Sequence, residues 1–332
     1  MTTEAYAAFL DPGHHAAATH PRVSTWWRWQ DHQVHIARPA PRPAPLAAAL
    51  AAPADESVGT VPLKPPKPAR PAVRVLVIHG GGGHSGALWP ITSLLAAQGL
   101  DVAAVDLPLY GRTLSLDPGA VRYQTWVGLL VDLLDAEHDD RPLILLGASM
   151  GGMLAYEAAA RSPHVAAVGA TSLLDPQDWR VRARLTRFGP LAVAGAQLTR
   201  LIPGGAAQMM VPMRAVADFA KMSRDPDLAE LCASDPLGGG ARIPVGFLSS
   251  FLNYDHVPGA EMTTPVTLLH PTHDAWTPVQ LSMRFLLRIA APTEAVMLRR
   301  CGHFPIEEPG VSDLVAAVVR LAGRHIETGP PA

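Results

Sequence analysis

At the centre of the chain stands Leu143-Ile144-Leu145-Leu146-Gly147-Ala148-Ser149-Met150-Gly151-Gly152, an apolar run that breaks into a Gly-x-Ser-x-Gly turn. The run is short, uniformly apolar and preceded by proline, which is typical of a buried parallel strand. The residues after the turn are rich in Ala, Leu and Met and predict a helix. Strand, sharp turn and helix together indicate a nucleophile elbow, with Ser149 above the end of the sheet and Gly147 and Gly151 allowing close backbone contact. The alternative is an incidental serine in a glycine-rich turn.

Short apolar strands alternate with amphipathic helices on both sides of this elbow. Besides the elbow strand, the predicted strands are residues 73–78, 102–105, 165–170, 265–270 and 294–298. Besides the elbow helix, the predicted helices are residues 87–98, 123–137, 278–289 and 312–325. Because the loops between them are short, this alternation predicts an α/β fold with a doubly wound, mostly parallel sheet and helices on both faces.

The remaining segments differ in composition from this core. Residues 25–29 and 33–37 flank a polar turn, which predicts an antiparallel hairpin. The next stretch is dominated by proline, which lacks a backbone donor, so this stretch is either a plain insertion or a ligand for proline-binding modules. The expected organisation is an irregular N-terminal arm (1–24), the hairpin (25–38), a Pro/Ala-rich insertion loop (39–72), the first half of the core (73–175), a helical cap insertion (176–263), the second half of the core (264–326) and a tail (327–332).

Composition excludes several classes of function. The chain has 332 residues, 17% of them charged, and a formal net charge of −2, which argues against a nucleic-acid partner. Cys232 and Cys301 lack metal-ligand spacing and are too few for a disulfide framework. His14, His15 and His20 cluster without Cys or carboxylates at ligand spacing, so we expect neither a metal nor a cofactor. No signal peptide or integral membrane segment is evident, which predicts a cytoplasmic protein, and its oligomeric state is left open.

Two loops after predicted strands carry the partners that a nucleophilic serine needs. A serine requires a base within hydrogen-bond reach and a carboxylate that orients the base. Asp274 follows the strand at 265–270, and His303 follows the last strand between Gly302 and Phe304. An aspartate in a turn is often only a capping residue, and a lone loop histidine is often only a surface residue. The order Ser149, Asp274, His303 is nevertheless the order expected after a nucleophile elbow.

The glycine-rich segment after the strand at 73–78 offers backbone donors for the oxyanion of such a reaction. Met150 follows the nucleophile and can donate its amide from the helix N-terminus. We expect the second donor to be Gly81, with Gly82 as second choice. A phosphate cradle is the alternative, but the segment lacks the Lys-Ser/Thr of a P-loop and the spacing of a dinucleotide fingerprint.

These motifs, taken in order, resemble the α/β-hydrolase family, and within it the lysophospholipase and monoacylglycerol-lipase-like carboxylester hydrolases. The resemblance runs from about Trp26 to His325. It implies an eight-stranded, mostly parallel sheet whose first strands form the hairpin, with an inserted cap over the active site. Ala148 stands where these lipases commonly carry His, and Tyr110 replaces a small residue or His. The motifs are His79-Gly80-Gly81-Gly82, Asp106-Leu107-Pro108-Leu109-Tyr110-Gly111-Arg112, the elbow from Gly147 to Gly152, His273-Asp274 and Gly302-His303-Phe304.

The function predicted from these residues is hydrolysis of a small-molecule carboxylic ester through an acyl-enzyme. Ser149 would attack, His303 would shuttle the proton and Asp274 would orient His303. The same three residues could serve a thioesterase, an amidase or an acyltransferase. A non-catalytic binding protein on the same fold is a further alternative.

The apolar residues of the segment 176–263 are the basis for predicting the substrate. Strands and helices stop alternating there, helices are expected at 181–188 and 212–224, and apolar residues are frequent. These residues either form the core of the cap or line an acyl pocket. In the second case we expect apolar acyl or aryl esters, monoglyceride-like or lysophospholipid-like, with uncharged medium-length acyl groups preferred. The residues concerned are Met209, Met210, Met213, Phe219, Met222, Phe247, Leu248, Phe251 and Leu252.

Overall fold

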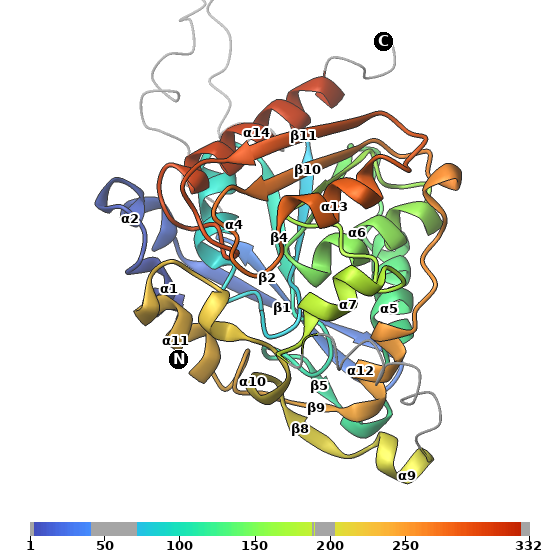
Figure 1. The fold of residues 1–332 in the computed structure, drawn as a ribbon. Coiled ribbons are helices and arrows are strands. Elements are labelled where there is room, and N and C mark those ends of the chain that lie inside the picture. The colour runs from blue at the N-terminus through green and yellow to red at the C-terminus, as the bar shows by residue number, and fades with distance from the viewer. Residues whose placement is uncertain (1–2, 41–71, 188, 190–202, 327–332) are drawn as a thin grey trace, which may run out of the picture.

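One large twisted sheet organises the computed structural model, which describes residues 3–40, 72–187, 189 and 203–326 (Figure 1). The strand order is β1-β2-β4-β3-β6-β7-β10-β11, and the short β5 pairs with β2 beside this path. The β1–β2, β2–β4 and β2–β5 pairs are antiparallel, and the others are parallel. The strands are β1 (Arg22–Trp29), β2 (His32–Pro39), β3 (Arg74–Ile78), β4 (Asp101–Val105), β5 (Leu114–Ser115), β6 (Leu143–Gly147), β7 (Ala167–Ala170), β10 (Val266–Pro271) and β11 (Thr293–Leu298). The mostly parallel sheet that begins with a hairpin is therefore confirmed, but the expected count of eight strands was wrong: the described residues form nine, because the short β5 adds to the edge of β2.

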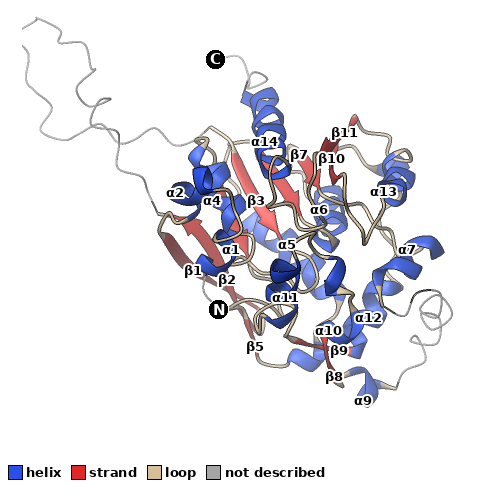
Figure 2. Cartoon of the chain, turned by 60° about the vertical axis from the view of Figure 1, so that its left-hand side comes forward, coloured by secondary structure: helices blue, strands red, loops and turns tan. Residues whose placement is uncertain are grey.

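Helices cover both faces of the sheet, as predicted. Contacts join α4 to α14 on one face, and α5 to α6 on the other (Figures 1 and 2). The strands between them bury nearly all their side chains, which explains why β6 is uniformly apolar. None of the described helices has the length and hydropathy that crossing a bilayer requires. The covering helices are α4 (Trp89–Ala97), α5 (Tyr123–Ala136), α6 (Met150–Arg161), α13 (Val279–Leu286) and α14 (Gly310–Ile326), and the 3-10 turn η1 (Pro118–Ala120) precedes α5.

The N-terminal arm is not irregular, and that expectation was wrong. It forms two short helices, α1 (Thr3–Ala7) and α2 (Pro12–Ala18), and β1 already begins inside the segment assigned to the arm. Asp11 caps α2 by accepting a hydrogen bond from the Gly13 amide, and proline occupies the first turn. Tyr6, in α1, and Leu10, just after it, are both buried, so they pack the arm onto the core.

The three N-terminal histidines bond to protein groups around this arm. His14 pairs with Glu308 ahead of α14, and Ser312 also contacts Glu308. The other two rings reach backbone carbonyls, His15 that of Leu10 and His20 that of Ala40. The His14 contact ties α2 to the C-terminal part of the fold, whereas those of His15 and His20 stay within the N-terminal 40 residues. The Pro/Ala-rich insertion falls almost wholly in 41–71, and the tail in 327–332, outside the described residues.

Between β7 and β10 the chain leaves the sheet and forms a separate layer of short elements (Figure 2). The single helix expected at 212–224 was wrong, because Ala217 is extended and separates a helix from a 3-10 turn. An antiparallel pair of strands, β8 with β9, was not predicted. The elements are α7 (Trp179–Leu185), α9 (Gly204–Ala207), β8 (Met210–Pro212), α10 (Met213–Val216), η3 (Phe219–Lys221), α11 (Pro226–Ser234), β9 (Arg242–Pro244), α12 (Val245–Leu252) and η4 (Gly259–Glu261).

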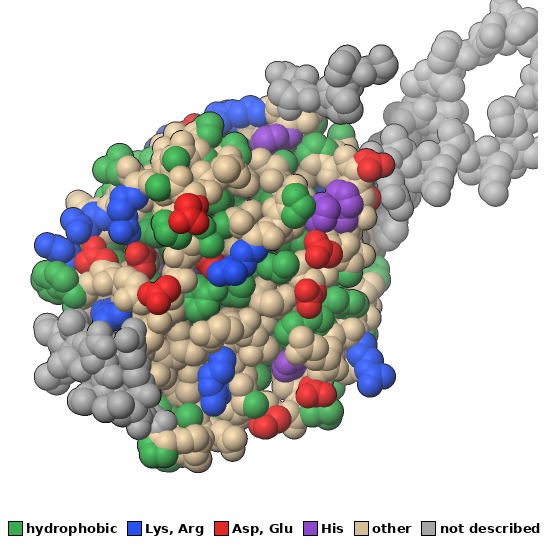
Figure 3. All heavy atoms as spheres, turned by 90° about the vertical axis from the view of Figure 1, so that its right-hand side faces the viewer, with side chains coloured by type: hydrophobic (Ala, Val, Ile, Leu, Met, Phe, Trp, Pro, Cys, Tyr) green, Lys and Arg blue, Asp and Glu red, His purple; other side chains and the backbone are tan. Residues whose placement is uncertain are grey.

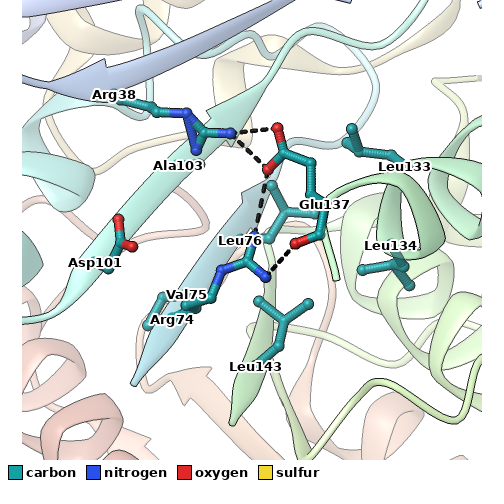
Figure 4. Close-up of a pocket in the computed structure, with 10 residues that line it drawn as sticks. All are labelled: Arg38, Arg74, Val75, Leu76, Asp101, Ala103, Leu133, Leu134, Glu137 and Leu143. Atoms are coloured by element: carbon teal, nitrogen blue, oxygen red, sulfur yellow. Dashed lines mark hydrogen bonds and ion pairs between the residues drawn. The ribbon is translucent and has the colours of Figure 1, made fainter. Parts of the chain in front are cut away.

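A small pocket lies at the amino ends of the central strands, away from the elbow (Figure 4). The Glu137 carboxylate accepts hydrogen bonds from Arg38 and Arg74 across it, and its volume is about 20 Å³. These ion pairs join β2 and β3 to the end of α5, so we assign the pocket a structural role. Elsewhere on the surface, the face seen in Figure 3 intersperses acidic, basic and apolar side chains.

Candidate active site

The turn between β6 and α6 holds Ser149 in a conformation that serine rarely adopts. Its φ is 55° and its ψ is −124°, with the backbone amide donating to Thr171 Oγ1 at 2.9 Å. A Cβ atom at Gly147 would lie 2.1 Å from the carbonyl oxygen of Gly151, and one at Gly151 would lie 2.4 Å from that of Ile78. Both positions therefore require glycine, and the turn has the form of a nucleophile elbow.

The structure brings Ser149, His303 and Asp274 together at the carboxyl ends of three strands. Ser149 Oγ lies 2.7 Å from His303 Nε2, and His303 Nδ1 lies 2.7 Å from Asp274 Oδ2. These residues follow β6, β11 and β10, whose parallel register places their loops at one edge of the sheet. The His303 side chain is 3% exposed and that of Asp274 is 1% exposed, so water does not separate the pair.

Asp274 is held by donors on both of its oxygens. The Trp276 and Thr277 amides donate to Oδ1 at 2.8 Å each, and the Thr277 hydroxyl donates to Oδ2 at 2.7 Å. Burial alone would raise the pKa of Asp274, but the neighbouring His303 and the Thr277 hydrogen bonds lower it to about 2. The carboxylate is therefore ionised at any working pH. Sequence reasoning missed Thr277, although an Asp-x-x-Thr turn ahead of a proline is a signal for such a bond.

The loop that carries His303 is fixed against neighbouring segments. The Phe304 amide donates to the Met222 carbonyl at 2.8 Å, which joins the loop to the layer between β7 and β10. The Gly302 amide donates to Glu307 Oε2 at 2.9 Å. The Trp276 ring lies 5.0 Å from the His303 ring, centroid to centroid. These contacts hold the imidazole in place between the serine and the carboxylate.

The glycine-rich loop after β3 lies directly beside the elbow. A Cβ atom at Gly80 would come within 3.0 Å of the Met150 nitrogen. His79 anchors the loop: its Nε2 accepts from the Leu107 amide at 2.9 Å, and its Nδ1 donates to the Gly80 carbonyl at 2.8 Å. Burial lowers the pKa of His79 to about 4, so this ring is neutral. Within the described part of the chain, the Gly81 and Met150 amides donate to no other protein group.

A narrow pocket of about 50 Å³ opens next to Ser149. Its lining contains no Asp, Glu, Lys or Arg among the described residues. Of the nine apolar residues singled out between 176 and 263, Met222 lines this pocket, whereas Phe247 and Phe251 pack on Tyr123. Met213 and Phe219 lie against the glycine-rich loop, since a Cβ atom at Gly81 would lie 3.0 Å from Met213 Cε and one at Gly82 would lie 2.5 Å from Phe219 Cζ. The apolar set is thus divided between packing on α5 and the surroundings of the pocket. The pocket is lined by Tyr6, His79, Gly80, Gly81, Gly82, Gly83, Ala87, Leu88, Ala148, Ser149, Met222, Cys232, His303, Phe304 and Pro305.

Comparison with known proteins identifies the family. The model of the Hydrolase_4 family, described as serine aminopeptidase, S33, matches residues 69–310. The chain belongs to this family. In sequence it is similar to a monoacylglycerol lipase of Mycolicibacterium smegmatis, 27% identical over 228 residues that cover 65% of this chain and 75% of the relative.

Solved structures share the fold of this S33 family member. A monoacylglycerol lipase of Paleococcus ferrophilus superposes with a TM-score of 0.62 at 21% identity, over 76% of this chain and 94% of that one. A soluble variant of the monoglyceride lipase of Saccharomyces cerevisiae gives a TM-score of 0.66 at 14% identity, over 93% and 98%. The α/β-hydrolase fold and the class of carboxylester hydrolase, both predicted from the sequence, are therefore confirmed.

Proposed function

We propose that the enzyme cleaves esters with Ser149 as nucleophile, His303 as proton carrier and Asp274 as the residue that orients His303. One observation carries this proposal, the continuous hydrogen-bonded chain from Ser149 Oγ through His303 to Asp274, with both links at 2.7 Å. A serine hydroxyl is a weak nucleophile at neutral pH, and this chain supplies the base that activates it. The ionised Asp274 favours the tautomer with its proton on Nδ1, so that Nε2 is free to accept the serine proton.

The reaction follows from this geometry. Ser149 Oγ attacks the ester carbonyl carbon while its proton passes to His303 Nε2. The imidazolium, stabilised by Asp274, then gives that proton to the departing alkoxide, and an acyl-enzyme remains. A water molecule repeats the sequence in the same roles and releases the acid, which restores the Ser149 hydroxyl.

The oxyanion of the tetrahedral intermediate needs two donors next to Ser149. We assign them to the Met150 and Gly81 amides, which are free of other protein partners in the described chain. Gly82 stays the second choice, because its amide lies beside the Tyr110 hydroxyl. Burial raises the pKa of Tyr110, and the Gly82 amide opposes part of that rise. The Gly82 backbone also has a φ of 78°, so a side chain there would be strained.

The pocket favours uncharged substrates. Its lining offers no carboxylate to bind a substrate amine and no cation to bind a phosphate or an acid. Apolar acyl or aryl esters, including monoglyceride-like esters, fit this lining, whereas the charged headgroup of a lysophospholipid finds no partner in it. The relatives named as monoacylglycerol lipases support the same substrate class.

The layer between β7 and β10 is proposed to be a cap over this site, with the boundaries 176–263 expected from the sequence. Met222 reaches the pocket from it, and the bond from the Phe304 amide to the Met222 carbonyl joins it to the catalytic loop. The other segment boundaries and the cytoplasmic location stay predictions.

Replacing the nucleophile tests the assignment. Ser149→Ala should abolish ester turnover and labelling by a fluorophosphonate probe, leaving at most the ~10³–10⁴-fold rate over water that remains when a triad member is removed. Ser234→Ala, at the end of α11, is the matched control and should keep both. Turnover near wild type in Ser149→Ala would contradict the proposal.

Matched substrates separate the alternatives that share the triad. Ester, thioester and amide of one acyl group, assayed with and without an added alcohol acceptor, distinguish an esterase from a thioesterase, an amidase and an acyltransferase. We expect the ester to be the best substrate and water the acceptor. Folded wild-type protein that the probe does not label would favour a non-catalytic binding protein.

A further inference from the structure

The pocket beside Ser149 is lined by a side chain from the opposite end of the sequence. Tyr6 belongs to α1, is 2% exposed and contributes to the pocket wall together with Leu88 and Cys232. Its ring meets that of Phe304, the neighbour of His303, edge to face at 6.1 Å between centroids. An N-terminal residue thus forms part of the wall around the space next to Ser149.

Buried hydrogen bonds hold this ring in place. The Tyr6 hydroxyl donates to Asp235 Oδ2 at 2.8 Å, and His84 Nε2 lies 2.8 Å from the same oxygen. The Leu237 amide donates to the other oxygen at 2.9 Å. Burial alone would raise the pKa of Asp235, but the contacts with His84 and Leu237 lower it to about 2, so Tyr6 bonds to a charged acceptor. Such bonds are stronger than neutral ones, and the ring has a fixed position.

The helix that carries Tyr6 is packed onto the fold. Ala7 and Leu10 are 4% exposed, and α1 contacts α4. The ring edge of His84 also faces Tyr6, at 6.0 Å between centroids. The wall is therefore part of the core and not a loose terminal segment.

We propose that Tyr6 determines specificity by closing the pocket and limiting the uncharged group, acyl or alkoxy, that can enter beside Ser149. The volume of about 50 Å³ compares with the ~10–15 Å³ that one water-sized group needs, so about four such groups fit. This inference rests on the proposed ester hydrolysis and sharpens it toward short chains. The medium-length preference expected from the sequence assumed a pocket lined by several residues of the 176–263 segment, and of the nine residues named there the described lining contains Met222.

The test compares chain-length profiles of kcat/KM for the full chain and its variants. Tyr6→Ala opens the wall, Tyr6→Leu shortens it while keeping apolar packing, and Tyr6→Phe keeps the ring but loses the bond to Asp235. Phe9→Ala, also an aromatic residue of the arm, is half-buried and does not line the pocket, which makes it the matched control. One substrate series lengthens the acyl group of a p-nitrophenyl ester, and the other lengthens the alcohol of an acetate ester.

We expect wild type to prefer the shortest members of the series whose variable group occupies the pocket. In Tyr6→Ala and Tyr6→Leu the optimum should move to longer chains in that series alone, with a relative gain of about fourfold per added methylene, equivalent to ~0.8 kcal/mol for each CH₂ buried. Tyr6→Phe and Phe9→Ala should keep the wild-type profile, because the ring that closes the pocket remains.

Three results would overturn the inference. These are unchanged profiles in Tyr6→Ala and Tyr6→Leu in both series, a shift in Phe9→Ala as large as in Tyr6→Ala, or a shift in Tyr6→Phe as large as in Tyr6→Ala. Failure of the proposed function looks different, because wild type itself would then neither hydrolyse esters nor react with a fluorophosphonate. Labelling rates with fluorophosphonates of increasing alkyl length give the same comparison without turnover.

Discussion

Glu157 offers a stringent test of how the nucleophile helix is held. It lies on α6 with a side chain that is 0% exposed, yet it carries a charge. Its Oε1 accepts from Arg161 Nε at 2.7 Å and from the Tyr254 hydroxyl at 2.9 Å. Its Oε2 accepts from the Val257 amide at 2.9 Å and lies 3.2 Å from His256 Nδ1. This carboxylate therefore fastens the chain segment before β10 to the helix that starts at the elbow.

Glu157→Gln keeps the shape of the side chain and removes its charge. Removing one partner of a buried ion pair costs ~3–5 kcal/mol, and because the amide oxygen of Gln still accepts, we expect the lower end, about 3 kcal/mol. Burial alone would raise the pKa of Glu157, but its bonds with His256 and Val257 lower it from 4.5 to about 2 in the folded protein. Because the pKa of Glu157 is lower in the folded protein than in the unfolded chain, its ionisation stabilises the fold fully above pH 4.5. This contribution to the free energy of unfolding is lost as the pH falls toward 2. The gap between wild type and variant should shrink over that range.

Urea unfolding followed by tryptophan fluorescence at pH 7 and at pH 4 measures both quantities. Glu137→Gln is the control, because its carboxylate pairs with Arg38 and Arg74 (Figure 4) but its side chain is 30% exposed, against 0% for Glu157. Water screens a pair that is partly open to solvent, so the control should lose less stability than Glu157→Gln. The argument fails if Glu157→Gln costs no more than Glu137→Gln, or if its cost is greater at pH 4 than at pH 7.

Two predictions concern the catalytic chain. Asp274→Asn should lower kcat/KM for a p-nitrophenyl ester by ~10³–10⁴-fold, because the neutral amide no longer selects the productive tautomer of His303, and a loss below tenfold would contradict the orienting role. Activity should also fall on acidification, since a protonated His303 cannot accept the serine proton. The pKa of Asp274 is about 2, so its carboxylate cannot cause this fall, and a rate profile flat between about pH 5 and 8 would count against His303 as the base.

The elements foreseen from the sequence are those with local signals. The elbow could be recognised because its Gly-x-Ser-x-Gly pattern stands between an apolar strand and a helix; the close contacts that require glycine there are those of Gly147 with the Gly151 carbonyl and of Gly151 with the Ile78 carbonyl of β3. Asp274 and His303 could be placed because each directly follows a strand, and parallel strands bring their carboxyl ends to one edge. The structure brings these residues together as expected.

The residues that were missed depend on contacts that are distant in the sequence. Tyr6 meets a carboxylate 229 positions away, so its place in the pocket has no local signature. The arm was judged irregular although Asp11-Pro12 is a helix start, because short helices are marginal until they pack. The break at Ala217 has no local signature either, because the residue is extended although Val216-Ala217-Asp218 contains neither Gly nor Pro.

The position of Tyr6 has a consequence for how this enzyme and its relatives diverge. The family match begins at residue 69 and contains Ser149, Asp274 and His303, whereas α1 lies before it. Part of the pocket wall, Tyr6, therefore lies outside the segment that carries the three proposed catalytic residues, while Leu88, Met222 and Phe304 of the same wall lie inside it. Substitutions at Tyr6 can therefore change the preferred chain length of the ester without altering the residues proposed to perform the reaction. On this proposal, a match to the family model does not by itself fix the size of ester that is accepted, because Tyr6 lies before the matched segment.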